Sequence, residues 1–406
     1  MNILFLTLVN IKDFEEKQNI YSDLCRELVS RGHNVHIVCP DEAGEATSLL
    51  KYREGSGILK VRTGRVQKTS LIKKGIATLM LGGQFKRAIK KHLCNVKFDI
   101  VIYSTPPITL YSIVKYVKKR DKATTYLLLK DIFPQNALDI GIMSKRGIKA
   151  PIYLYFRLME KRLYAISDSI GCMSEANAEY IKRQDPEIPK EKIHISPNSV
   201  EPIITTLSLD EKNAIRVRYG LPTDKKIFIY GGNIGKPQGV PFIIDCLNAV
   251  GDLDGCHFVI CGTGTELPLL KKYSENTESR NFTLIPGLPR AEYEEFVGCC
   301  DVGLIFLDYR FTIPNFPSRL LSYMQKSMPV ISCTDRATDI GRTIEEGGFG
   351  VSCFSNNAHS FRDAVLSLIS EDTDSIGRNG AKYLLENFTV QRSADIILEK
   401  YNEVNR

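Results

Sequence analysis

The chain lacks several features that would assign it to a special class of protein. A transmembrane helix needs about 20 consecutive, mainly apolar residues, and no stretch of the 406-residue sequence approaches that length. Low-complexity tracts are also missing. The opening stretch MNILFLTLVN has no basic leader, so we expect a buried strand there rather than a signal peptide. A soluble globular protein of two domains fits these absences.

Patterns typical of disulfides and metal sites are missing too. The eleven cysteines are an odd number, lie scattered along the chain and form no Cys-x-x-Cys pair. The six histidines show no ligand spacing. Two Asp-x-Asp triplets, Asp252–Asp254 and Asp372–Asp374, are expected before a strand and after a helix, which are poor places for a metal site. We therefore expect buried free thiols in a reducing cytoplasm and no metal ion.

Positive charge is concentrated in one part of the sequence. The net charge is +7, and residues 51–97 contain 13 Lys or Arg but a single acid, Glu54. The rest of the chain is consequently net negative. This concentration predicts an anionic partner for one face of the protein.

Short apolar strands alternate with helical patterns along the first half of the chain. We expect strands at Ile3–Val9, Val35–Cys39, Ile58–Arg62, Ile100–Tyr103, Thr125–Lys130, Ser169–Met173 and Ile193–Ser196. A helix is expected from Asn19 to Ser30, and Gly32 suits the left-handed position that ends many helices. The alternation predicts βαβ units and a parallel sheet with helices on both faces.

The same alternation restarts in the second half. We expect strands at Ile227–Tyr230, His257–Cys261, Thr283–Ile285, Val302–Phe306, Val330–Cys333 and Gly350–Cys353. A polar linker is expected at Asn198–Asp224, and a lone amphipathic helix at Tyr383–Val404. The sequence thus predicts an α/β protein with domains at 1–200 and 201–382 and a C-terminal helical segment at 383–406. Doubly wound domains bind ligands at the carboxyl ends of their strands, so the cleft between two such domains is the expected site.

The most informative stretch is Phe228–Gly239, which reads FIYGGNIGKPQG. An apolar strand runs into a glycine-rich turn, and a helical pattern follows. Glycines let an anion approach the backbone, and the N–H groups at a helix N-terminus favour negative charge. The turn therefore suits a diphosphate, and a tight structural turn is the alternative. Its candidate anion contacts are Gly232, Asn233, Gly235, Lys236 and Gln238.

A second informative stretch is Ile313–Cys333, which reads IPNFPSRLLSYMQKSMPVISC. Together with RGHNVHIVCP near the start, SPNSV at Ser196–Val200 and the glycine turn, it resembles the retaining glycosyltransferases of family four. The bacterial polysaccharide and O-antigen branch is the most similar. The resemblance covers nearly the whole chain. It implies GT-B architecture, with two Rossmann-like doubly wound domains facing a central cleft and a C-terminal helix that crosses back to the first domain.

The resemblance also implies a reaction. Such enzymes move a sugar from a nucleotide diphosphate donor to an acceptor hydroxyl, with retention at the anomeric carbon and without a metal or other cofactor. The second domain would bind the donor and the first the acceptor. Pro317 suits the first position of a helix whose N-terminus, with Ser318 and Arg319, would hold phosphate oxygens. We expect Lys236 and Arg319 to stabilise the anionic leaving group as the bond breaks.

The sequence departs from the family pattern at several positions. Asn233 and Gln238 occupy the places of the usual Arg and Lys of the glycine turn. The two family glutamates fall at Pro314 and Ser322. In the family, the second glutamate usually binds the donor ribose. We expect Ser322, which stands at its position, to make a weaker hydrogen bond there. Asn315 is the candidate neighbour of the donor sugar.

Further donor contacts are expected by resemblance at other strand ends and in the donor helix. Gly262 follows one strand, and the backbone of Gly287 and Leu288 would meet the base. Asp339 would bind sugar hydroxyls, and Leu320 lies in the donor helix. Plain turns, loop acids or helix caps are the alternatives for these positions.

In the first domain, Asp131 follows an apolar strand in the order Lys130-Asp131-Ile132-Phe133-Pro134. Many relatives place a His before this Asp. A carboxylate there would orient or deprotonate the acceptor hydroxyl. A turn or N-cap aspartate is the alternative.

The stretch Leu71–Leu93 interleaves apolar and basic residues without an acid. This pattern suits the headgroup region of an anionic membrane leaflet, and a solvated face over a core helix is the alternative. Nucleic acid is not an expected partner, because no binding module or aromatic platform accompanies the charge. The candidate contacts are Lys73, Lys74, Lys86, Arg87, Lys90 and Lys91.

These features predict a metal-independent hexosyl- or N-acetylhexosaminyl-transferase on the inner face of the plasma membrane. It would use a nucleotide sugar, with UDP favoured, and a lipid diphosphate-linked saccharide acceptor in capsule or O-antigen assembly. A sugar-nucleotide epimerase of the same architecture is one alternative. A non-catalytic nucleotide-sugar binding protein is another, favoured by the missing glutamates.

Overall fold

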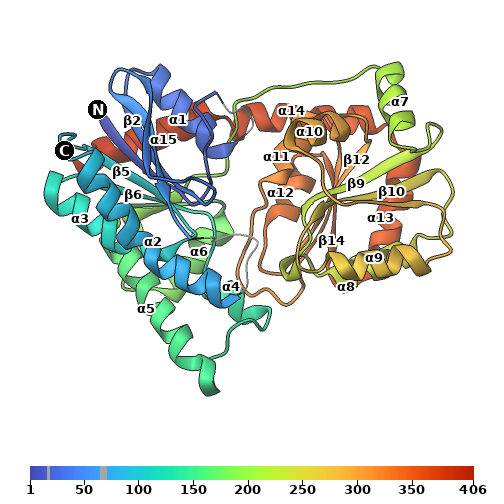
Figure 1. Cartoon of the computed structure of the whole chain (residues 1–406). Helices are drawn as coiled ribbons and strands as arrows, with labels where there is room; N and C mark the ends of the chain where they lie inside the picture. The colour runs from blue at the N-terminus through green and yellow to red at the C-terminus, as the bar shows by residue number, and fades with distance from the viewer. Residues whose placement is uncertain (16–18, 65–70) are drawn as a thin grey trace. The chain divides into compact units, whose positions relative to one another are not determined.

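The computed structural model describes residues 1–15, 19–64 and 71–406, without the side chains of 71–79. The chain divides into two compact units. Unit 1 comprises Met1–Glu201 with Thr389–Arg406, and unit 2 comprises Pro202–Phe388. Each unit has its own sheet and its own hydrophobic core (Figure 1).

Unit 1 is built on an eight-stranded sheet with the order β3-β4-β2-β1-β5-β6-β7-β8. Its strands are β1 (Asn2–Leu6), β2 (Asn34–Asp41), β3 (Ser48–Arg53), β4 (Ser56–Arg62), β5 (Ile100–Ser104), β6 (Thr124–Leu129), β7 (Ser169–Cys172) and β8 (Ile193–Ile195). Every predicted strand of this half exists. The unpredicted strand β3 pairs antiparallel with β4, while the other neighbouring pairs are parallel. Sequence reasoning missed β3 because this edge strand is largely exposed and lacks a continuous apolar run.

The helices of unit 1 follow the periodic stretches of the sequence. They are α1 (Ile20–Ser30), α2 (Leu71–His92), α3 (Tyr111–Asp121), α4 (Gln135–Asp139), α5 (Ala150–Ile166), α6 (Glu175–Gln184) and α15 (Val390–Val404). Asn19 caps α1, because its side chain accepts a hydrogen bond from the N–H of Tyr21. Gly32 has a φ of 86°, the left-handed conformation expected for it.

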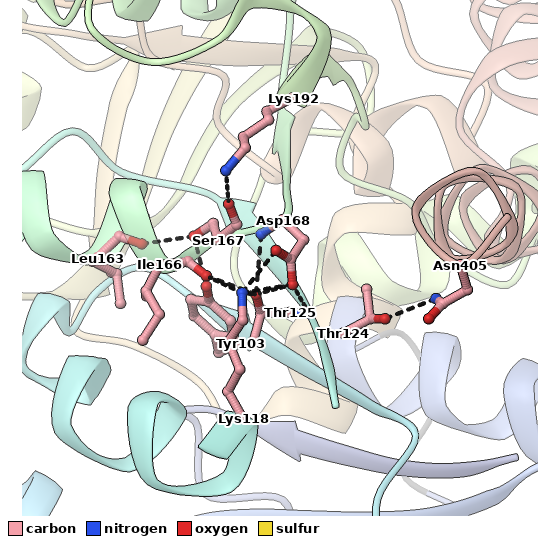
Figure 2. Close-up of polar contacts among 10 residues, drawn as sticks. All are labelled: Tyr103, Lys118, Thr124, Thr125, Leu163, Ile166, Ser167, Asp168, Lys192 and Asn405. Atoms are coloured by element: carbon pink, nitrogen blue, oxygen red, sulfur yellow. Dashed lines mark hydrogen bonds and ion pairs between the residues drawn. The ribbon is translucent and has the colours of Figure 1, made fainter. Parts of the chain in front are cut away.

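A polar cluster fixes the amino ends of β6 and β7 (Figure 2). The ammonium group of Lys118 on α3 donates to both carboxylate oxygens of Asp168, at 2.7 and 2.8 Å. Asp168 also accepts from the N–H and the hydroxyl of Thr125. Tyr103 and Ser167 share a hydrogen bond of 2.6 Å beside them. This cluster therefore holds the end of the sheet that is opposite the carboxyl ends of β6 and β7.

Unit 2 is built on a six-stranded parallel sheet with the order β11-β10-β9-β12-β13-β14. Its strands are β9 (Lys226–Asn233), β10 (Cys256–Thr263), β11 (Phe282–Ile285), β12 (Val302–Phe306), β13 (Val330–Thr334) and β14 (Gly350–Phe354). This is the doubly wound order. Strands β10 and β11 are added on one side of β9, and β12 to β14 are added on the other, so the strand order reverses between β9 and β12. The predicted α/β class with two Rossmann-like domains is confirmed. Ligands of such sheets bind beyond the carboxyl ends of the strands at this reversal.

Helices cover both faces of the second sheet. They are α7 (Leu209–Arg218), α8 (Val240–Ala249), α9 (Leu267–Asn276), α10 (Arg290–Gly298), α11 (Arg319–Gln325), α12 (Ile340–Glu346), α13 (Ala358–Ser370) and α14 (Thr373–Asn387). In Figure 1, α8, α9 and α13 lie on one side of the sheet, and α10, α11 and α12 lie on the other. The predicted linker was wrong in part, because α7 lies inside it. Its signal was present, since Ser208 and Glu211 form a capping box.

The last part of the chain corrects another prediction. The single helix expected at Tyr383–Val404 is two helices, α14 and α15, separated at Phe388 and Thr389. The side chain of Thr389 accepts from the N–H of Arg392 and so begins a new helix. Helix α15 packs on the first domain as expected, with Ala394 and Ile397 in the unit 1 core.

None of the helices described combines the length and the apolar character needed to cross a bilayer.

Candidate functional site

The glycine-rich turn lies at the carboxyl end of β9 in unit 2. The strand continues through Gly231 and Gly232 to Asn233, further than the sequence predicted. A short 3-10 turn over Lys236–Gln238 follows, and Gly239, with a φ of 63°, leads into α8. The turn therefore sits at the reversal point of the sheet, where a doubly wound domain binds its ligand.

The side chain of Arg319 lies against this turn. Gly232 has a φ of 124°, and a Cβ built on it would lie 3.4 Å from Nη2 of Arg319. The guanidinium carbon lies 4.3 Å from the ring centroid of Tyr230, which is a cation–π distance. Nη1 of Arg319 is buried and has no hydrogen-bond partner among the residues described. The structure thus brings two predicted donor contacts together and leaves donor capacity on the guanidinium.

The other side chains of the turn divide into two groups. Oε1 of Gln238 accepts hydrogen bonds from Nδ2 of Asn233 at 2.9 Å and from the N–H of Gly235 at 3.1 Å. These contacts give Gln238 and Asn233 a role in holding the turn. Lys236 is exposed at the start of the 3-10 turn. Its ammonium group is consequently the more accessible cation of this turn.

The carboxyl end of β10 and the residue after it approach the glycine turn closely. A Cβ on Gly262 would lie 1.9 Å from the carbonyl oxygen of Gly232, and one on Gly264 would lie 2.0 Å from that of Ile234. Gly262 is therefore required by packing of one main chain on another. Gly287, at the end of β11, has a φ of 72° and lies next to Thr263. The loops after three neighbouring strands thus meet at one edge.

The donor helix begins later than predicted. Pro317 was expected at its first position, but α11 begins at Arg319 and Ser318 is the N-cap residue, without a side-chain capping bond. The N–H of Leu320 donates to the carbonyl oxygen of Pro317 at 3.2 Å. The side chain of Leu320 is fully buried, which argues against its predicted contact with a donor.

Ser322 has an acidic neighbour that sequence reasoning did not find. Its hydroxyl donates to Oε2 of Glu294 on α10 at 3.4 Å. Burial raises the pKa of the Glu294 carboxyl above its usual range, and the nearby Lys326 and Arg290 oppose this rise. A carboxylate therefore stands beside the position at which the family pattern has a glutamate. No spacing in the sequence points to Glu294, because it belongs to another helix.

The loop after β13 is organised by Asp335. Its carboxylate accepts from the N–H groups of Ala337 and Thr338 and from the hydroxyl of Thr338. Burial raises the pKa of Asp335 to about 6. The Thr338 hydroxyl also accepts from the N–H of Asn315, so this loop holds the segment before α11. Asp339 occupies the N-cap position of α12 without a side-chain capping bond.

In unit 1, Asp131 follows β6 and is half-buried. Its N–H donates to Oγ1 of Thr105, and its Oδ1 accepts from Asn136 at 2.7 Å. The N-cap of α4 is Pro134, so the N-cap alternative for Asp131 is excluded. The structure leaves Asp131 in a turn at the carboxyl end of the strand, where ligands of such sheets bind.

The neighbouring Lys130 reaches into the unit. Its ammonium group donates to the carbonyl oxygens of Ser196 and Pro197 at 3.4 and 3.3 Å. Burial lowers the pKa of this lysine to about 7. The lysine joins the end of β6 to the segment after β8.

The predicted basic contacts on α2 are only partly described. Lys73 and Lys74 lie outside the described side chains. Lys86 and Lys90 lie 5.1 and 5.0 Å from the ring centroid of Tyr116, so they face α3. Arg87 and Lys91 are exposed. Of the apolar residues of this part, Leu81, Phe85, Ala88 and Ile89 belong to the core, whereas Met80 is 55% exposed.

Among the residues described, no group of three His, Cys, Asp or Glu side chains is placed to hold a metal ion. The two Asp-x-Asp triplets have other contacts. Asp252 pairs with Arg362, and Asp372 caps α14 by accepting from the N–H groups of Asp374 and Ser375.

Comparisons with known proteins agree with this geometry. The family model described as Glycosyltransferase Family 4 matches residues 19–202, and the model described as Glycosyl transferases group 1 matches residues 211–383. The probable glycosyltransferase WbjE of Pseudomonas aeruginosa is 23% identical over 365 residues, which are 90% of this chain and 88% of that protein. The putative colanic acid biosynthesis glycosyl transferase WcaI of Escherichia coli is 22% identical over 61% of this chain and 60% of that protein.

Solved structures support the fold. HepE of Anabaena, in complex with UDP and glucose, superposes with a TM-score of 0.69 and 12% identity, covering 99% of both chains. At this identity the likeness concerns the fold alone. The expectation drawn from the glycine turn and from Ile313–Cys333 is confirmed by the family models. The chain belongs to glycosyltransferase family 4, and its two doubly wound units are those of the GT-B fold.

Proposed function

We propose that this chain is a retaining, metal-independent hexosyl- or N-acetylhexosaminyl-transferase. Its donor is a UDP-sugar and its acceptor a lipid diphosphate-linked saccharide in capsule or O-antigen assembly, at the inner face of the plasma membrane. The name of WcaI, which refers to colanic acid biosynthesis, supports a polysaccharide product. The UDP and glucose bound to HepE support the choice of donor.

The position of Arg319 against Gly232 carries the proposal. A diphosphate at this turn would meet a guanidinium that retains an unused N–H donor, and a turn whose glycine has no side chain. Lys236 supplies a second cation. The charge on the leaving diphosphate grows as the glycosidic bond breaks, so these contacts strengthen in the transition state and accelerate the reaction. Metal-independence follows, because side chains neutralise the diphosphate.

Glu294 extends the donor site in this proposal. Its carboxylate lies beside Ser322, at the position where the family binds the donor ribose, and supplies the acceptor atoms that Ser322 lacks. Glu294→Gln is expected to weaken binding of UDP but not of pyrophosphate, which has no ribose. Equal losses for both ligands would remove Glu294 from the ribose site.

Asp131 serves the acceptor in unit 1. Its carboxylate is placed at the end of β6, with one oxygen held by Asn136. It orients the acceptor hydroxyl and takes up its proton as the new bond forms. Gly287, Leu288, Asn315, Ser318 and Asp339 complete the proposed donor contacts.

Incubation with UDP-, GDP- and dTDP-sugars and bacterial membranes tests the function. Transfer of labelled sugar to the lipid fraction in the presence of a chelator is the expected result, and proton NMR of the product reports retention. Interconversion of free nucleotide sugars would replace the proposal with an epimerase. Donor binding without either reaction, under every donor and membrane tested, would indicate a binding protein.

A further inference from the structure

Helix α5 and the 3-10 turn before it expose an unusual set of apolar side chains. Ile148 is 97% exposed, Leu154 64%, Ile152 53%, Leu158 47% and Tyr155 45%. We call this set the α5 face. Ile152, Tyr155 and Leu158 follow one another at intervals of three residues, so they lie along one side of the helix, and Ile148 precedes them in the 3-10 turn.

The opposite side of α5 is fixed to unit 1. Phe156 packs edge-on against Phe133 at 5.1 Å, and Leu163 is fully buried. Arg157 pairs with Glu160 of the same helix and with Asp185 at the end of α6, and the second contact ties α5 to its neighbour. The exposure of the α5 face is therefore a property of a packed helix rather than of a frayed one. In Figure 1 the amino-terminal turns of α5 extend beyond the neighbouring elements of unit 1.

The charged residues in the segment that carries the α5 face are mostly basic, and one of them, Lys161, pairs with Glu187 beyond the segment. Between Ser144 and Arg162 the chain has six basic residues and one acid, Glu160. That acid is 2% exposed and is held by Arg157 and Tyr164. The exposed basic residues are Lys145, Arg146, Lys149, Lys161 and Arg162. A solvent-exposed apolar surface thus has cations at both ends and no exposed carboxylate within its own segment.

We propose that the α5 face docks on an anionic membrane surface. Its apolar side chains enter the headgroup boundary, and the surrounding lysines and arginines contact lipid phosphates. A second copy of the chain is a poor partner for this face, because a symmetric contact would bring the basic residues of the two copies together. Charge complementarity with phosphate is what selects the lipid surface.

This site lies on another helix than the one expected on α2, whose described apolar residues, Met80 excepted, are buried. The proposal rests on the proposed function only in that a lipid-linked acceptor explains why the enzyme would meet a membrane. Vesicle binding needs neither a donor nor a transfer reaction. The two proposals are therefore tested separately.

The test compares the intact protein with the double variant Ile148→Glu/Leu154→Glu in vesicle co-sedimentation. Both positions are exposed, so folding is expected to persist. Wild type should bind vesicles of equal amounts of phosphatidylglycerol and phosphatidylcholine and should bind phosphatidylcholine alone far less. The double variant should lose at least about tenfold in partition to the mixed vesicles, since it removes apolar contact and adds charge of the wrong sign. Lys145→Ala/Arg146→Ala should reduce binding and its salt dependence.

The matched control is Leu209→Glu/Val217→Glu, which makes the same charge change at two exposed apolar positions of α7. It should bind vesicles like wild type. Equal binding by wild type and the α5 double variant, or no binding of mixed vesicles by wild type, would overturn the proposal. So would a wild-type dimer that the α5 variant dissociates, seen by sedimentation velocity. UDP binding should be unchanged in all variants, and its absence from wild type would refute the proposed function alone.

Discussion

At the scale of single residues, the donor side of unit 2 depends on the half-buried guanidinium of Arg319. Arg319 packs on Tyr230 and lies against Gly232, yet Nη1 makes no hydrogen bond within the residues described. Native proteins seldom leave a buried donor unused, and such groups commonly serve a ligand. The cost of burying this guanidinium is offset when an anion binds beside it.

Arg319→Ala is expected to lower the affinity for UDP by about 10- to 100-fold, because a hydrogen bond to a charged group contributes about 1.5–3 kcal/mol. Isothermal titration calorimetry measures the change. Arg218→Ala is the control, since Arg218 pairs with Glu295 at the surface of the same unit. Unchanged affinity in the Arg319 variant would refute the phosphate assignment.

Lys130 predicts a dependence of stability on pH. Burial lowers its folded pKa from 10.5 to about 7, so the unfolded chain binds the proton more tightly. Burying the protonated lysine lowers the free energy of unfolding. This loss is fully present below about pH 7 and disappears as the pH rises toward 10.5.

The quantity to compare is the free energy of unfolding of wild type minus that of Lys130→Met. This difference should rise by roughly 2 kcal/mol between about pH 7 and about pH 9. Urea titrations at the two pH values give this difference, and the variant cancels the titration of other groups. A difference that is flat or falls with pH would show that Lys130 is not buried in its neutral form.

At the scale of elements, the site depends on strands whose ends approach each other closely. Gly232 at the end of β9 lies against Gly262 at the end of β10, and only a hydrogen in place of a side chain permits this contact at Gly262. Sequence reasoning found both glycine stretches, because glycine after an apolar strand is a local signal, but both strands continue into these glycines. It left open whether Gly262 serves packing or a ligand, and the structure gives packing as a sufficient reason.

Gly262→Ala should destabilise unit 2 by about 1–3 kcal/mol and weaken UDP binding, because the new methyl group displaces the main chain of Gly232. Thermal unfolding and calorimetry measure the two effects. Gly251→Ala is the matched control, since its added Cβ would be no closer than 3.4 Å to other atoms. A Gly262 variant as stable as this control would contradict the packing argument.

At the scale of the whole molecule, each unit folds around a core of its own, and α15 belongs to the core of unit 1 although it follows unit 2 in sequence. Arg31, the C-cap residue of α1, pairs with Asp395 on α15, and Asn405 donates to Thr124 at the start of β6. The end of the chain is therefore a structural part of the first domain.

Ile397→Ala should destabilise unit 1 by about 2–5 kcal/mol through the cavity it creates in that core. Hydrogen exchange followed by mass spectrometry should show faster exchange in α1 and β1 and little change in β9 to β14. Ile344→Ala, at a fully buried position of unit 2, should produce the reverse pattern. Faster exchange in both units for either variant would indicate a single cooperative core.

The sequence by itself determined the two alternating α/β halves, the glycine turn and the family. These are local properties, since strand and helix periods, turn glycines and the motif Ile313–Cys333 can each be recognised within one segment. Where a local signal was weak, prediction failed. The exposed edge strand β3 was missed, and two successive helices that are separated at Thr389 were predicted as one.

Only the tertiary structure decided which side chains meet. The contacts of Arg319 with Gly232 and of Glu294 with Ser322 each join separate elements, and no spacing in the sequence encodes them. The same holds for surfaces. An amphipathic pattern does not say which apolar residues are covered, and the exposed apolar residues of α5 were found only in the structure. The physical reason is that burial depends on what the rest of the fold places against a helix, whereas periodicity depends on the helix alone.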